Sequence, residues 1–322
     1  MKILVIRFSS IGDIVLTTPV VRVLAKQLPK AEIHYCTKKS FASIVQNNPY
    51  VNKVHILDGK LNDLISDLKK ENFDYVIDLH NNLRSFIIKT RLGVESSSFK
   101  KENFLKWLLV KFKYKPSAIS HVTERYLATT SKLGIVDDGE GLDYFIPEKD
   151  IVNIDTLPPI FQQGFLTYAI GGQHGTKQMP VHKMIEFCSQ VTRPIILLGG
   201  KEDFDNAEKI IASCENKVLI YNACGKYNLN QSASLLQQAR QVITHDTGLM
   251  HIASALRKNI ISIWGNTVPA LGFTPYKVPF TAIEANNVSC RPCSKLGYAK
   301  CPKGHFDCME KIDVKDILLA IK

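Results

Sequence analysis

The stretch from Gln241 to Thr267 constrains the fold most, because it holds two short apolar runs separated by one helical pattern. The β-branched run Val242–Thr244 ends at a polar break over His245–Gly248. Apolar residues then recur at helical spacing from Leu249 to Leu256, before a second apolar run at Ile260–Trp264. A strand, a crossover helix and a return strand predict a βαβ unit with parallel strands.

In such a unit Asp246, Thr247 and Gly248 would lie at the carboxyl edge of the sheet and at the start of a helix. Ligands of α/β folds bind at this edge, and the free N–H groups of a helix N-terminus attract phosphate. The alternative is that Asp246 or Thr247 only caps the helix. The turn by itself leaves both interpretations open.

The N-terminus repeats this strand–turn–helix pattern. Lys2–Phe8 is an apolar strand, Ser9–Asp13 a polar turn and Ile14–Gln27 a helical pattern, in which Pro19 predicts a kink. The turn lacks the G-x-G-x-x-G spacing of a dinucleotide fold, so a nicotinamide enzyme is not supported.

The whole chain alternates between strand and helix patterns, which predicts an α/β fold with mainly parallel sheets. Its 322 residues exceed one ordinary domain. The periodicity fails between Pro147 and Gly164, so we expect two facing Rossmann-like domains, residues 1–155 and 156–322, with a cleft between them. The final helix, Val314–Ile321, is a candidate to pack back on the first domain. Further strands are expected at Glu32–Thr37, Lys53–Leu57, Tyr75–Leu79, Leu166–Ile170, Pro194–Leu198 and Lys217–Tyr221.

The formal charge of +11 favours an anionic partner. The charge is concentrated between Arg84 and Lys115, which contain nine basic and two acidic residues. Apolar residues alternate with lysines over Phe104–Lys113, which fits a basic amphipathic helix on an anionic membrane. It equally fits a partly buried helix with a solvated lysine face. Because no nucleic-acid-binding motif accompanies the charge, no nucleic-acid partner is expected.

A cytoplasmic location is expected from two features. No apolar run approaches the roughly 18 residues that a membrane span needs. The apolar start, Met1–Phe8, lacks a small-residue cleavage site, so it is interpreted as a strand and not as a signal peptide.

Four of the eight cysteines cluster late in the chain, at Cys290, Cys293, Cys301 and Cys308, with His305 nearby. One C-x2-C pair fits a structural zinc site, but the other spacings do not match a zinc knuckle. Plain thiols, a structural metal and redox behaviour all stay open, and none identifies the catalytic chemistry.

Three motifs together resemble glycosyltransferase family 9, the ADP-heptose:lipopolysaccharide heptosyltransferases. They are Arg7–Val15 with Thr18-Pro19, Gly171-Gly172 with Thr176–Pro180, and Asp246–Leu256 with Gly265–Thr267 and Pro269. The resemblance implies a GT-B fold and an inverting enzyme that needs no metal and no cofactor. It also implies an ADP-heptose donor and a lipopolysaccharide core acceptor at the inner face of the cytoplasmic membrane. A protein or another glycan as acceptor, and a non-catalytic nucleotide-sugar-binding protein, are the alternatives.

The resemblance assigns roles in the first domain. Asp13 matches the family's general base, which takes the proton of the acceptor hydroxyl. The alternative is that Asp13 caps its helix. Ser9, Ser10 and Gly12 would shape the acceptor side.

In the second domain Lys177 matches a lysine that contacts the donor's phosphate, against the alternative of a plain surface lysine. Thr247 and Gly248 would hold pyrophosphate with their amides, and Asp246 would bind sugar hydroxyls.

Two further donor contacts are less defined. His251 belongs to the same donor loop, with core packing as its alternative. An acidic residue, Glu202 or Asp203, resembles the ribose contact. Met179 departs from the tryptophan of many members, which leaves the sugar undetermined.

Overall fold

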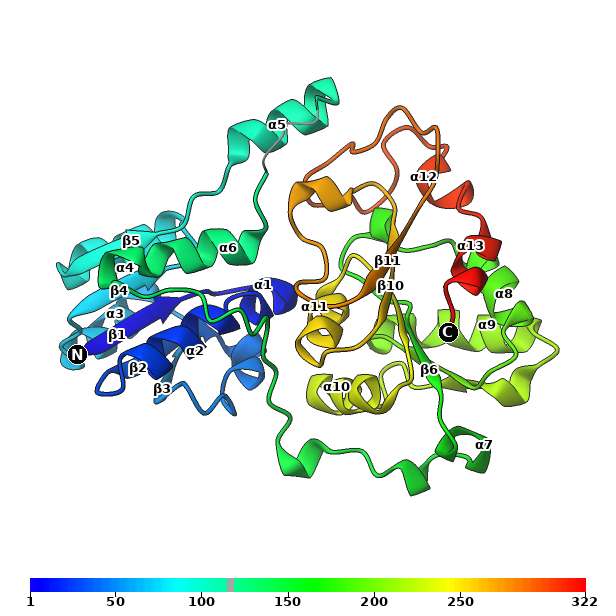
Figure 1. Ribbon diagram of the computed structural model, residues 1–322, viewed down its shortest axis with the longest axis horizontal. Helices are drawn as coiled ribbons and strands as arrows, with labels where there is room; N and C mark the ends of the chain where they lie inside the picture. The colour runs from blue at the N-terminus through cyan, green and yellow to red at the C-terminus, as the bar shows by residue number, and fades with distance from the viewer. Residues whose placement is uncertain (115–118) are drawn as a thin grey trace. The chain divides into compact units, whose positions relative to one another are not determined.

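The structure, a computed structural model, describes residues 1–114 and 119–322 (Figure 1). The chain divides into two compact units. The first unit comprises Met1–Lys101 and Ser120–Phe145, and the second comprises Glu102–Ile119 and Ile146–Lys322. In the described parts of the chain no helix combines the length and the apolar character that a bilayer crossing requires.

The first unit contains a five-stranded parallel sheet in the order β3-β2-β1-β4-β5. The strands are β1 Lys2–Ile6, β2 Glu32–Lys38, β3 Lys53–Leu57, β4 Tyr75–Asp78 and β5 Glu95–Ser98. The helices are α1 Ile11–Val15, α2 Thr18–Gln27, α3 Leu61–Lys70, α4 Leu83–Leu92 and α6 Val122–Leu127.

Alternation along β1 gives this sheet its two buried faces. Leu4 and Ile6 pack with Leu64 and Leu68 of α3 and with Ile88 of α4. The intervening β1 residues are also fully buried, as expected when helices cover both faces of a parallel sheet.

The predicted helix 14–27 is broken. α1 ends at Val15 and α2 begins at Thr18, with Pro19 in its first turn. Proline is tolerated there because the first N–H groups of a helix have no intrahelical partner. The expected kink is therefore a complete break just before Pro19.

The second unit contains a six-stranded parallel sheet in the order β11-β10-β9-β6-β7-β8. The strands are β6 Leu166–Ala169, β7 Ile195–Leu198, β8 Ile220–Asn222, β9 Val242–His245, β10 Ile260–Trp264 and β11 Phe280–Glu284. The helices are α5 Asn103–Phe112, α7 Pro159–Gln162, α8 Val181–Gln190, α9 Phe204–Ser213, α10 Leu229–Gln238, α11 Gly248–Ala255, α12 Asp307–Glu310 and α13 Val314–Leu319.

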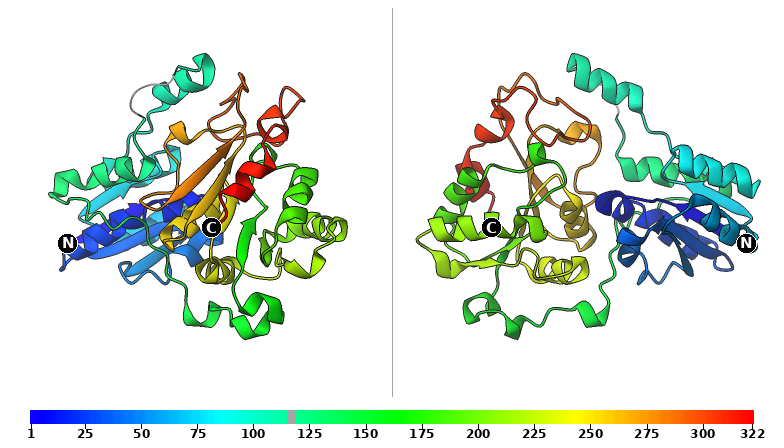
Figure 2. Two further views of the ribbon diagram at one scale, coloured as in Figure 1. Left: turned by 45° about the vertical axis from the view of Figure 1, so that its right-hand side comes forward. Right: turned by 180° about the vertical axis from the view of Figure 1, so that it is seen from behind.

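Helices cover both faces of this sheet (Figure 2). α8, α9 and α13 share one core with Tyr168, Leu197 and Ile243 of the sheet. α10 and α11 pack together on the opposite face, and α11 contacts β9 and β10. The buried side of α13 is taken up by this core, where Val314 and Ile317 are fully enclosed.

The predicted α/β class with parallel sheets is confirmed. Two edge strands were not predicted: β5 is the polar run ESSS, and β11 has three exposed residues out of five. Neither has the apolar pattern that identifies a buried strand. The division between the units falls at Phe145, shortly before the expected linker.

Candidate functional site

Three loops of the second unit meet at the carboxyl edge of its sheet. Lys177 follows β6, Asp246 follows β9 and Thr267 follows β10. The Lys177 Nζ lies 2.6 Å from Asp246 Oδ2, and Thr267 Oγ1 donates to the same oxygen at 2.8 Å. Their convergence depends on the predicted βαβ unit, since parallel strands end on one edge.

The capping alternative for this turn is not realised. Thr247 is the N-cap residue of α11, yet its side chain makes no capping hydrogen bond to the helix. Asp246 directs its carboxylate to Lys177 and Thr267 instead. The first N–H groups of α11, beginning at Gly248, thus lie beside an ion pair at a helix N-terminus, an arrangement suited to an anion.

Lys177 is not a plain surface lysine, because only 17% of its side chain is exposed. The preceding Thr176 is buried and donates through Oγ1 to Asn266 Oδ1 at 3.0 Å. Tyr298 N–H donates back to Thr176 Oγ1 at 2.8 Å. A Cβ on Gly175 would lie 2.4 Å from the Ala299 carbonyl oxygen, so glycine is needed for this close approach.

Two histidines border the turn. His245, at the end of β9, is fully buried, and burial lowers its pKa to about 3. Its Nε2 accepts from the Met179 N–H at 3.1 Å, so the neutral ring fixes the chain just after Lys177. His251 is also buried, within α11. His245 was assigned no role from the sequence, where it stood only as part of a polar break.

The structure distinguishes Glu202 from Asp203 as candidates for the ribose contact, a choice that the sequence left open. Asp203 is buried, its Oδ2 accepts from the Gly200 N–H at 2.8 Å, and burial raises its pKa. A Cβ on Gly171 would lie 2.1 Å from that oxygen, so Asp203 closes the loop after β6. Glu202 is exposed beside Gly200 and is the acidic residue accessible to a ligand. Asp205 follows Asp203 at Asp-x-Asp spacing, but the burial of Asp203 prevents the two from acting as an exposed carboxylate pair.

In the first unit, Asp13 lies just after β1 and is held by two neighbours. Arg7 Nη2 lies 2.9 Å from Asp13 Oδ2, and Ser10 donates to the same oxygen from Oγ at 2.8 Å. The Ser10 N–H also lies 3.3 Å from this oxygen. Asp13 therefore completes part of a helix cap, while its side chain stays about a quarter exposed. The side chain of Asp13 can therefore take part in the helix cap and still be reached from solvent.

Arg7 organises this edge, a role that the sequence did not predict although Arg7 opens the first motif. Its guanidinium donates to the Ser9 carbonyl at 2.7 Å and to the Leu79 carbonyl at 2.6 Å. His80 lies beside it, edge-on to Phe8. Burial and the Arg7 charge lower the pKa of His80 to about 4. Gly12 is buried in α1, and Ser9 and Ser10 are partly exposed in the turn.

The basic segment is divided between the two units. Arg84, the first basic residue, lies in α4, whereas Lys106 lies in α5 and Lys115 falls outside the described residues. Lys106 is buried, with its Nζ 4.5 Å from the centre of the Phe273 ring. The exposed residues of α5 include three aromatic side chains, with Trp107 in contact with both Phe104 and Phe112, and also Lys111. α5 is thus a partly buried helix whose exposed side carries aromatic rings as well as Lys111, so both interpretations of the segment stay open.

The cysteine-rich tail is fastened to the site loops. Arg291 donates to the main-chain carbonyls of Trp264 and Thr267, at 3.1 and 2.9 Å. None of the eight cysteines forms a disulfide bond, and burial raises the pKa of Cys308 to about 12. The tail thus supports the loop after β10.

Comparison with known proteins gives consistent results. The sequence model of glycosyltransferase family 9 (heptosyltransferase) matches residues 61–301. Lipopolysaccharide heptosyltransferase 1 of Campylobacter coli is 24% identical, over 83% of this chain and 84% of that protein. Lipopolysaccharide heptosyltransferase 2 of Escherichia coli K12 is 22% identical, over 85% of each.

Solved structures share the fold. The ADP-heptose lipopolysaccharide heptosyltransferase II of Escherichia coli aligns over 99% of this chain and 97% of its own, with a TM-score of 0.75 and 20% identity. A family 9 glycosyltransferase from Veillonella parvula aligns over 99% and 95%, with a TM-score of 0.77. The predicted GT-B fold is confirmed by these similarities. With the family sequence model matching most of its length, this chain belongs to glycosyltransferase family 9 and is a glycosyltransferase.

Proposed function

We propose that this enzyme transfers a heptose from ADP-heptose to a lipopolysaccharide core acceptor, with inversion at the anomeric carbon. Residues 1–155 would bind the acceptor and residues 156–322 the donor. The observation that carries the proposal is the Lys177–Asp246 ion pair at the N-terminus of α11. The relatives named lipopolysaccharide heptosyltransferase support the choice of sugar and acceptor.

The donor would be held by the second unit. The amides of Thr247 and Gly248 and the dipole of α11 suit a pyrophosphate. Lys177 would move from Asp246 to the phosphate, leaving the Asp246 carboxylate for sugar hydroxyls. Glu202 is our choice for the ribose contact because it is exposed and Asp203 is not. His251 would support the donor loop from within α11.

Asp13 would act as the general base. As the acceptor oxygen forms its bond to the anomeric carbon, its proton passes to the Asp13 carboxylate. The bond between the anomeric carbon and the phosphate oxygen breaks, and ADP leaves with that electron pair. Arg7, 2.9 Å away, favours the carboxylate form of Asp13 before the reaction. Ser9, Ser10 and Gly12 would line the acceptor side of this turn.

Charge on the departing ADP would be offset by the protein. Lys177 supplies a full positive charge and α11 a partial one, both at the carboxyl edge of the sheet. We therefore propose a reaction without a metal or another cofactor.

We also propose that the enzyme works in the cytoplasm, at the inner face of the cytoplasmic membrane, with α5 as its contact. The aromatic side chains of Phe104, Trp107 and Phe112 are 68%, 47% and 61% exposed. Aromatic rings beside lysines suit an anionic lipid interface. Vesicles rich in anionic lipid should bind the protein, and Trp107→Ala should weaken this binding.

The test begins with calorimetric titration of ADP, UDP and GDP into the purified protein in EDTA. We expect selective ADP binding, followed by transfer from ADP-heptose to a lipopolysaccharide core acceptor that also proceeds in EDTA. Selective UDP or GDP binding would reject the ADP-sugar. ADP-heptose use with a protein or another glycan, but not with lipopolysaccharide, would reject the acceptor.

A further inference from the structure

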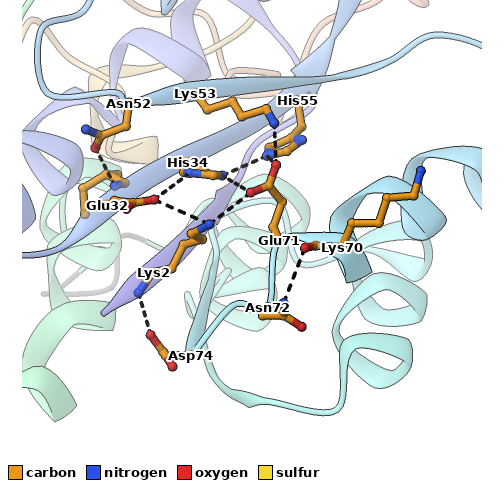
Figure 3. Close-up of polar contacts among 11 residues, drawn as sticks. Lys2, Glu32, His34, Asn52, Lys53, His55, Lys70, Glu71, Asn72 and Asp74 are labelled. Carbon is orange, nitrogen blue, oxygen red and sulfur yellow. Dashed lines mark hydrogen bonds and ion pairs between the residues drawn. The ribbon is translucent and has the colours of Figure 1, made fainter.

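We propose that His34, His55 and Glu71 form a binding site for a divalent transition-metal ion, for which zinc is the best match. The three residues come from β2, from β3 and from the end of α3 (Figure 3). His34 lies in the amino-terminal half of β2, His55 lies in the middle of β3 and Glu71 precedes the start of β4, whereas Asp13 follows the carboxyl end of β1. The site is therefore at the opposite edge of the sheet from the proposed catalytic residue.

The distances between the ligand atoms match zinc coordination. His34 Nδ1 lies 2.9 Å from His55 Nε2 and 3.9 Å from Glu71 Oε2, and His55 Nε2 lies 3.9 Å from Glu71 Oε1. Tetrahedral bonds of about 2.0–2.1 Å place ligand atoms roughly 3.3–3.4 Å apart. Shifts of about half an ångström would seat the ion, and a His₂Glu set leaves a fourth position for water.

Both rings are held in place before any ion binds. His34 and His55 are 3% and 7% exposed, and the Phe73 ring meets both edge-on at centroid distances of 5.2 and 5.9 Å. A neutral imidazole is the form that binds metal, and the 2.9 Å contact between the two ring nitrogens requires at least one of those nitrogens to carry no proton. The two rings share one proton across their 2.9 Å contact, and an ion would replace that proton.

An outer carboxylate adds independent support. Glu32 Oε2 lies 3.7 Å from His34 Nε2, the ring nitrogen that points away from the site. When an ion takes Nδ1, the proton of the neutral ring must be on Nε2, facing Glu32. Metal-bound histidines commonly donate their second N–H to such a carboxylate, which fixes the ring and strengthens the bond.

Two lysines neutralise the charge of Glu71 when no ion is bound. The alternative interpretation is therefore that these residues form a purely structural network of ion pairs. Lys2 Nζ lies 3.1 Å from Glu71 Oε2, and Lys53 Nζ lies 2.5 Å from Glu71 Oε1. The Lys53 side chain is 56% exposed and can turn into water. If the site binds an ion, Lys53 competes with that ion for Glu71. If the network is purely structural, there is no ion for Lys53 to compete with.

The experiment uses the full chain, stripped with a chelator, reduced and then titrated with Zn²⁺ and Co²⁺. Calorimetry gives the zinc affinity, and the visible spectrum of Co²⁺ reports its ligands. Cobalt held by the tail cysteines shows intense thiolate charge-transfer bands, whereas cobalt at His34, His55 and Glu71 does not. We expect a thiolate-free cobalt site that His55→Gln removes.

The matched control is His182→Gln, because His182 is a surface histidine 2.9 Å from the Glu310 carboxylate and, among the described residues, belongs to no cluster of three possible ligands. It should leave the thiolate-free site unchanged. Absence of that site in the unmodified protein, or its survival in His55→Gln, would overturn the proposal. If His55→Gln does not fold, the Lys53→Met variant tests the proposal instead, because it keeps all three proposed ligands. Removing one competing charge should tighten zinc binding about fivefold, and unchanged affinity would overturn the proposal.

Discussion

Lys177 and Asp246 carry opposite charges and have different proposed roles, in binding the donor phosphate and the sugar hydroxyls. Two substitutions can test these roles separately. Lys177→Ala removes the cation meant for the donor phosphate. Asp246→Asn removes the carboxylate that pairs with the Lys177 ammonium, at 2.6 Å, when no donor is present. If the roles are right, the first change should weaken nucleotide binding, and the second should not.

The magnitude follows from burial and charge. The side chains of Lys177 and Asp246 are 17% and 8% exposed, so an effective dielectric constant of about 20 applies. A lysine about 5 Å from a phosphate charge is then worth roughly 3 kcal/mol. Since the ammonium gives up its contact with Asp246 to bind phosphate, we expect a net loss of about 2 kcal/mol, or roughly 30-fold in the ADP dissociation constant.

The opposite result is expected for Asp246→Asn. It removes a negative charge beside the phosphate and frees Lys177, so ADP should bind severalfold tighter. ADP-heptose should lose affinity relative to ADP, because the proposed sugar contact is gone. Calorimetry of both ligands with both variants, with thermal unfolding as a folding control, measures these differences. The reasoning would be refuted if Lys177→Ala bound ADP within threefold of the affinity of the unmodified protein. It would also be refuted if Asp246→Asn bound ADP as weakly as Lys177→Ala does.

Three further predictions concern stability. Gly171→Ala places a Cβ 2.1 Å from the Asp203 carboxylate, so thermal unfolding should reveal a loss of about 1–3 kcal/mol; an unchanged midpoint would argue against this packing. Arg22 is 2% exposed and donates twice to Asp138 at 2.8 Å, so Arg22→Met should cost about 3 kcal/mol in urea unfolding, and a loss below 1 kcal/mol would contradict a structural role. His245 has a folded pKa of about 3, below the roughly 6.5 of an unfolded histidine, so the unfolded state binds more protons between these values. Its contribution is fully present above pH 6.5 and falls as the pH is lowered, so the free energy of unfolding should drop by about 2 kcal/mol from pH 7 to pH 5; a flat profile would contradict the burial of this ring.

Much of the fold could be predicted from local patterns. The strands β1, β6, β9 and β10 consist mainly of apolar or β-branched residues, because a parallel sheet covered on both faces needs such residues. The break before Pro19 follows from proline chemistry. The edge strand β5 could not be predicted, because the backbone pairing of ESSS with β4 leaves no pattern in its side chains.

The site was predictable where one strand leads into one turn. The turns at Asp13 and Asp246 lie next to strands whose ends can be read from the sequence. Contacts between distant segments could not be predicted. Thr267 reaches Asp246 from the loop after the next strand, and His34 meets Glu71 only once α3 is placed beside β2. Such contacts depend on the packing of whole elements, which no local pattern contains.

Asp13→Asn is the measurement that tests the central claim most directly. Asparagine keeps the size of the side chain and can still accept from Ser10, but it is not a base. The account predicts that transfer from ADP-heptose falls by about 10²–10⁴-fold while ADP binding stays close to that of the unmodified protein. Loss of the ion pair with the buried Arg7 lowers the thermal stability, and thermal unfolding checks that the variant is still folded at the assay temperature. Transfer within tenfold of the unmodified enzyme, with ADP binding intact, would contradict the account and leave Asp13 as a helix cap.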